Sequence, residues 1–253
     1  MLDDLILCAT ALVAGAQNSI AGGGTLYTFP TLLRVLTDSR VANGTSTAAL
    51  VPGSVAGAWG YASEVRQTPR STLILLMVPS LLGAAAGTLL VVNFPESYFK
   101  TMVPWLILTA ATLFLIQPQI AKFTKSHAVE HRPSAWVQAG VIFFQFLVAV
   151  YGGYFGAGIG ILMLTSLSLM GLGDIHRVNA LKTVLASGIN AVSVAIFIAH
   201  DMVRWHFALP MAAAAIVGGY LGARLARRMN KTMVRWLVIV IGFGLAAYYF
   251  IRQ

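Results

Sequence analysis

Charged residues are scarce in this chain. Only 10% of its 253 residues are Asp, Glu, Lys or Arg, and 58% are hydrophobic, whereas soluble domains have about 25% and about 45–50%. A soluble fold would have to bury several apolar runs of about 20 residues, each long enough to cross a bilayer. The composition therefore excludes a soluble globular protein and predicts an integral membrane protein.

Cysteine and acidic residues are also few. The single cysteine, Cys8, excludes an internal disulfide and a metal cluster built from several cysteines. The eight acidic residues all fall in termini, loops or segment edges, which argues against a carboxylate proton relay and against cation transport. Coupling to protons or sodium would then use backbone carbonyls, hydroxyls, Lys182 or a histidine such as His176. We expect no metal and no organic cofactor.

Basic residues outnumber acidic ones and give a net charge of +9. In a soluble protein this excess would suggest nucleic acid as a partner, but here the charges lie between apolar runs, where they orient the chain among membrane lipids. Placing the connection at 64–70 inside puts twelve Lys and Arg residues inside and five outside. The positive-inside rule favours this topology, with both termini outside.

The apolar runs predict an all-α polytopic membrane protein with eight to ten segments. Two of ten runs, 25–36 and 160–170, are too short to span the bilayer, and each follows a glycine cluster. A polar stretch at 117–133 divides the chain. We therefore predict a first membrane repeat over 1–118, a linker over 119–133 and a second repeat over 134–253.

The two halves resemble each other in sequence. Gly22 and Gly24 align with Gly156 and Gly158, and the Arg-Val pair at Arg40 aligns with the pair at Arg177. Shared composition is the alternative explanation. Five segments per half would make the repeats inverted, because an odd number of crossings reverses the direction of entry. Inverted repeats place a binding site at their interface near the middle of the membrane.

The glycine clusters predict helices broken at membrane depth, because each glycine costs a helix about 1 kcal/mol. Such a break leaves backbone N–H and C=O groups to be satisfied by protein, water or substrate. Free N–H groups at the start of the next helix form an anion site. The alternative is close helix packing through small residues, which accounts for Gly83 to Gly87.

Polar residues follow each break and extend the candidate site. Lys182 either reaches back to the inner interface or presents its charge to a cavity, and the hydroxyls and amides are either ligands or caps. The predicted substrate-binding residues are Asn18, Gly22, Gly23, Gly24, Thr25, Asn43, Thr45, Ser46, Tyr154, Gly156, Gly158, Asn179, Lys182 and Thr183.

Two sequence patterns carry a family resemblance over nearly the whole chain. The runs at 21–26, 43–47 and 52–57 resemble the first-half pattern of the TauE/SafE family of anion transporters, and the runs at 154–160 and 174–182 resemble its second-half pattern. Gly158-Ile159-Gly160 interrupts the longer glycine run of many members. The resemblance implies movement of sulfite or organosulfonates across the bacterial inner membrane by alternating access.

Two other functions are weighed against a transporter. An anion channel would use the same residues, and an intramembrane enzyme would pair a Ser or Thr with Lys182. We expect no enzyme, because polar groups spread over two mirrored breaks suit a shared binding site better than one reacting centre. The sequence is compatible with a homodimer.

Overall fold

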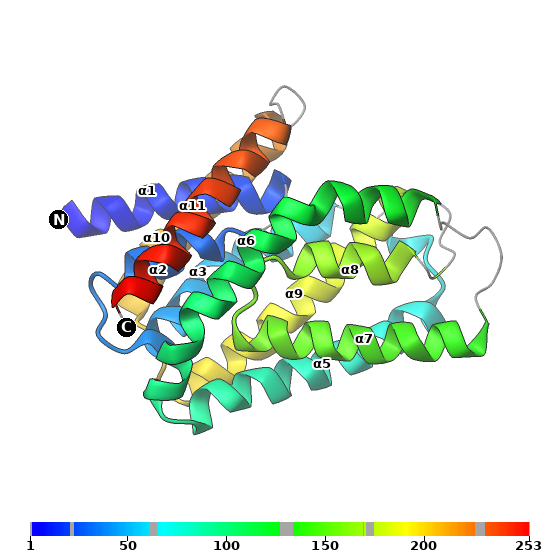
Figure 1. The fold of residues 1–253 in the computed structure, drawn as a ribbon, viewed down its shortest axis with the longest axis horizontal. Coiled ribbons are helices and arrows are strands. Elements are labelled where there is room, and N and C mark those ends of the chain that lie inside the picture. The colour runs from blue at the N-terminus through cyan, green and yellow to red at the C-terminus, as the bar shows by residue number, and fades with distance from the viewer. Residues whose placement is uncertain are drawn as a thin grey trace.

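The computed structural model describes residues 2–20, 23–60, 65–126, 134–168, 170, 175–225 and 231–252. Over these ranges helices joined by turns and short irregular segments make up the chain (Figure 1): α1 (Leu2–Ile20), α2 (Thr25–Leu32), α3 (Ser39–Gly60), α5 (Arg70–Asn93), α6 (Glu96–Ser126), α7 (Ala135–Tyr154), α8 (Ile159–Ser168), α9 (Ile175–Ala199), α10 (Trp205–Leu225) and α11 (Lys231–Arg252). Four stretches are long and apolar enough to cross a membrane: Arg70–Asn93, Glu96–Gln119, Ala135–Tyr154 and Ala180–Ala199. The prediction of an all-α polytopic membrane protein is confirmed.

The two short helices follow the glycine clusters, as predicted. Helix α8 turns back along α7, since Ile159 lies against Gly152 and Ser166 Oγ lies 3.5 Å from Gln145 Oε1. Helix α2 likewise turns back along α1 (Figure 1), and Gly24 lies against the Ala14 carbonyl. Each short segment is therefore the returning arm of a helical hairpin. We call residues 23–24 the first tip and residues 155–158 the second tip.

Helix α6 extends into the predicted linker. Helix α6 continues through Pro118 to Ser126, so residues 119–126 are helical. Proline lacks one backbone donor and usually only bends a helix whose other hydrogen bonds persist. Polar residues such as Lys122 continue a helix readily once it leaves the apolar layer. Residues 127–133 of the predicted linker lie outside the part that the structure describes.

The same order of helices occurs twice, as α1-α2-α3-α5-α6 and as α7-α8-α9-α10-α11. The first helix of each half packs on the fourth helix of the other half, in the pairs α1–α10 and α7–α5. The third helix also packs on the fourth of the other half, in α3–α10 and α9–α5, while α3 contacts α9 and α6 contacts α11. This reciprocal exchange is what two repeats around a shared axis would produce.

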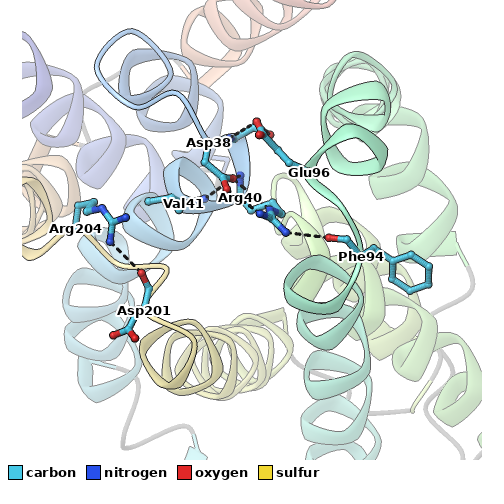
Figure 2. A network of polar contacts seen from close by, with 8 residues as sticks. Asp38, Arg40, Val41, Phe94, Glu96, Asp201 and Arg204 are labelled. Atoms are coloured by element: carbon cyan, nitrogen blue, oxygen red, sulfur yellow. Dashed lines mark hydrogen bonds and ion pairs between the residues drawn. The ribbon is translucent and has the colours of Figure 1, made fainter.

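Polar contacts identify two opposite faces of the bundle. At one face the starts of α3 and α6 are joined by Ser39, whose N–H and hydroxyl both donate to Glu96 Oε1 over 3.0 and 3.2 Å. The start of α10 joins them where Arg204 N–H donates to Thr45 Oγ1 over 3.0 Å. We call this the clasp face (Figure 2). At the opposite face Arg177 donates to Gln67.

Glycines allow the exchanged helices to approach backbone to backbone. Gly218 of α10 lies against the Leu12 carbonyl of α1, and Gly87 of α5 lies against the Val150 carbonyl of α7. Gly83 lies against Phe146, so close packing is the correct interpretation of the Gly83 to Gly87 motif. Van der Waals contact between such surfaces drives helix association where no hydrophobic effect operates.

We expect Gly218→Ala to destabilise the fold. The new methyl group would overlap the Leu12 backbone, and overpacking of this kind costs about 1–3 kcal/mol. Thermal unfolding in detergent should show a lower midpoint than for the matched control Gly140→Ala, whose methyl group has open space within 4 Å. Equal midpoints for the two variants would contradict the close contact.

Candidate functional site

The first tip depends on glycine and on one amide. Gly23 has φ +87°, a left-handed conformation that costs other residues roughly 1–2 kcal/mol. The Gly24 N–H donates to Asn18 Oδ1 over 2.7 Å, so Asn18 closes the turn from α1 into α2. Thr25 is the first residue of α2 and is partly buried. Gly22 lies outside the described residues.

The second tip turns through two left-handed glycines, Gly156 with φ +82° and Gly158 with φ +80°. The N–H groups of Phe155 and Gly156 both donate to the Tyr151 carbonyl, over 2.9 and 3.1 Å. The Tyr151 hydroxyl donates to the Ala157 carbonyl over 2.8 Å. Backbone groups freed by the break are thus satisfied on the side where α7 ends.

Both tips contact the same stretch of α6. A Cβ atom added at Gly23 would lie 2.6 Å from the Phe114 ring, and one added at Gly158 would lie 3.7 Å from Ala110. These α6 residues are about one turn apart, near the middle of the Glu96–Gln119 span. The rings of Phe29 and Phe155 also meet edge to face, 5.3 Å apart. The structure therefore brings the two glycine clusters together.

Lys182 lies beside the start of α8. Its Cδ and Nζ atoms are 3.4 and 4.0 Å from the position that a Cβ atom on Gly160 would occupy. The side chain is partly buried, and no described residue hydrogen bonds or ion pairs with its ammonium group. The first N–H groups of a helix have no intrahelical acceptor and carry the positive end of its dipole. A fixed charge and the positive end of a helix dipole are thus adjacent here, and the Ile161 N–H in this turn donates to the Gly158 carbonyl over 3.0 Å.

The polar residues of α3 connect helices. Asn43 Nδ2 donates to the Tyr154 carbonyl over 3.0 Å, and the hydroxyls of Ser46 and Thr28 lie 2.6 Å apart. Thr45 is directed to the Arg204 N–H at the start of α10. Thr45 thus connects α3 to the start of α10, and its role in substrate binding stays a prediction. Asn43 and Ser46 instead tie α3 to the second hairpin and to α2.

For two predicted site residues on α9, the structure shows little of the side-chain surroundings. Thr183 is partly buried, and its carbonyl accepts from Ser187 over 2.8 Å. Asn179 lies on α9, but its side chain is outside the described part.

Sequence reasoning missed three groups at the site. Phe114 supports the first tip, Tyr151 closes the second tip, and Gly160 adjoins Lys182. Gly160 and Tyr151 stand within the second glycine cluster, so their proximity to the break was readable from the sequence. Phe114 lies in an unbroken apolar run, where no pattern distinguishes it from other packing residues.

Comparison with known proteins identifies the family. The model of the sulfite exporter TauE/SafE family matches residues 7–249. The chain belongs to this family. A probable membrane transporter protein of Haemophilus influenzae is 29% identical over 96% of this chain and 92% of its own length. A probable membrane transporter protein of Escherichia coli K12, YfcA, is 24% identical over 96% of this chain and 87% of its own length. No solved structure gives a significant match.

The family and the helical fold together define the class of protein. This TauE/SafE member is a membrane transporter, and it acts on a small substrate. It is a multi-pass protein of the bacterial inner membrane.

We expect Gly23→Ala to lower stability by about 1–2 kcal/mol, because alanine is strained at this φ, and further because its methyl group would press on Phe114. Thermal unfolding should show the loss against the control Gly244→Ala, which has open space on α11. Adding Phe114→Leu should recover the part of the stability loss that comes from contact with the ring. The part that comes from the left-handed backbone conformation of residue 23 should remain. Stability equal to that of the control would contradict the left-handed turn.

Proposed function

We propose that this transporter moves small anions, sulfite or organosulfonates, across the inner membrane by alternating access. The observation that carries the proposal is the position of Lys182 beside Gly160, at the start of α8. The substrate class follows the family description, which names sulfite. The halves 1–118 and 134–253 would act as inverted repeats, with the anion held near the two tips on α6.

Electrostatics supports an anion at this position. A lysine at the centre of a membrane helix costs about 2.5–3.5 kcal/mol to insert, and less towards its end. Lys182 lies two turns into α9, and no described carboxylate offsets its charge. A sulfite or sulfonate group would supply the missing negative charge and oxygen acceptors for the N–H groups of α8.

The channel remains the second candidate, and flux measurements separate it from a carrier. Flux through a carrier saturates with substrate at the turnover of its conformational cycle, whereas an open pore conducts far faster. An enzyme that uses a Ser or Thr with Lys182 has less support, because no described hydroxyl hydrogen bonds with the Lys182 ammonium group. The experiments below therefore use proteoliposomes and follow both affinity and rate.

Lys182→Gln should weaken anion binding. The variant keeps length and polarity but removes the charge, so we expect the apparent affinity for sulfite to fall at least about tenfold, which corresponds to 1.4 kcal/mol. Sulfite uptake into proteoliposomes at increasing concentration measures this affinity, with sulfoacetate, sulfate and chloride as competitors.

The matched control for this experiment is Lys122→Gln. Lys122 is an exposed lysine near the end of α6, so its variant loses the same charge away from the tips and should transport normally. If the two glutamine variants had the same affinity, Lys182 would be an interface anchor.

Gly160→Ala should change which anions the protein transports without lowering the stability of the fold. Alanine favours a helix over glycine by about 1 kcal/mol, and its methyl group would meet Lys182 Cδ at an ordinary contact distance of 3.4 Å. We therefore expect an unchanged or higher unfolding midpoint. Because the methyl group narrows the space beside the ammonium group, sulfoacetate uptake should fall more than sulfite uptake.

Gly244→Ala provides the comparison, since it makes the same change in open space on α11. Equal losses for the larger and the smaller anion in Gly160→Ala would place the substrate away from the start of α8.

A further inference from the structure

The clasp face carries a polar cluster centred on Arg40 (Figure 2). The Arg40 guanidinium donates to both carboxylate oxygens of Asp38, over 3.2 and 2.8 Å, and to the Phe94 carbonyl over 3.0 Å. Ser39 adds the two hydrogen bonds to Glu96. We call Asp38, Ser39, Arg40, Phe94 and Glu96 the clasp. It joins the start of α3 to the connection between α5 and α6.

The charge state of the clasp is stable near neutral pH. Burial opposes ionisation of the Asp38 carboxyl, but hydrogen bonds from the Arg40 side chain and backbone outweigh it, so the pKa of Asp38 is lowered. Asp38 and Arg40 therefore form an ion pair within the start of α3 under physiological conditions. The contacts that join α3 to the connection between α5 and α6 are the hydrogen bonds from Arg40 to Phe94 and from Ser39 to Glu96.

Aromatic side chains fill the space beneath the clasp. Phe29 of α2 packs edge to face on Phe99 of α6 and on Phe155 of the second tip, with ring centroids 6.2 and 5.3 Å apart. Tyr154 packs on Phe99 at 5.3 Å. All three phenylalanines are at most 2% exposed. These buried rings join α2, the second tip and the start of α6.

Arg177 is the counterpart of Arg40 in the second half. Both arginines precede a valine in the first turns of the third helix of their half, α3 and α9. Among the described residues, Arg177 makes one hydrogen bond, from Nη2 to Gln67 Oε1 over 3.2 Å at an exposed position. Its Nε atom is buried and has no partner in the described part of the chain, whereas the Nε atom of Arg40 is bonded to Asp38. In the described contacts, the arginine at the opposite face is thus engaged less fully than Arg40.

We propose that the clasp is the gate at its face of the membrane, closed in this conformation, and that Arg177 is the matching gate residue at the opposite face. The Nε atom of Arg177, which has no described partner in this conformation, gains a hydrogen-bond acceptor when that face closes. In a two-state cycle the contacts of one gate form when those of the other gate break. Their free energies therefore offset each other, and neither state is favoured strongly. This inference rests on alternating access but not on the identity of the substrate.

Accessibility of a single cysteine tests the gate without any transport assay. In a Cys8→Ser background, Thr183→Cys places a thiol next to Lys182, and membrane-impermeant maleimide is added to right-side-out or inside-out vesicles. Tyr98→Cys, exposed at the start of α6, identifies the vesicles in which the clasp face is outside. From that face, Arg40→Gln should speed labelling of residue 183 about fivefold or more, by shifting the population towards the open state.

Arg177→Gln should have the opposite effect and slow labelling from the clasp face, because it removes the gate that stabilises the alternative state. Arg34→Gln is the matched control, since Arg34 is an exposed arginine near the clasp face. Glu96→Gln loosens the Ser39 contacts and should speed labelling independently of Arg40. If residue 183 were labelled no faster in Arg40→Gln and Glu96→Gln than in Arg34→Gln, the proposal would be overturned.

The test also distinguishes the gate from the anion site. Faster labelling in Arg40→Gln together with unchanged anion affinity in Lys182→Gln would leave the gate in place and reject the site. Reduced affinity in Lys182→Gln together with unchanged labelling in the clasp variants would reject the gate alone.

Discussion

The need to satisfy backbone polar groups inside a membrane governs the centre of this structure. Two hairpins reverse direction within the bundle, and each reversal frees N–H and C=O groups that lipid cannot satisfy. The chain supplies its own partners: Asn18 for Gly24, Tyr151 for the Ala157 carbonyl and Asn43 for Tyr154. At the start of α8 the chain places Lys182 beside Gly160.

Helix α6 and the glycine contacts hold the hairpins in register. The tips rest on neighbouring turns of α6, so a shift of one tip changes the surface available to the other. Around them, α1–α10 and α5–α7 approach so closely that their spacing is fixed by backbone atoms rather than by flexible side chains.

The sequence predicted the fold well because its signals were local. Apolar runs and glycine clusters located ten helices and both breaks, since helix length and helix breaking depend on neighbouring residues. The direction of return after each break was not readable, because it depends on contacts such as Ser166 with Gln145. The partner of Thr45 was equally hidden, since Arg204 belongs to the other half. The polar stretch at 117–133 was visible in the sequence, but the continuation of α6 into it as far as Ser126 was not.

The exchange of helices between the halves has a consequence for biogenesis. Helix α1 packs mainly on α10, and the first-half core includes Ala208, Met211 and Ala215 of that late helix. A ribosome therefore releases α1 into the membrane long before its neighbour is synthesised. During that interval Gly15 of α1, which later lies against Ala215 of α10, faces lipid or an insertion chaperone. The polar residue Gln17 of α1 is in the same position. Folding of this transporter is consequently completed only after α10 emerges, however early the first helices enter the bilayer.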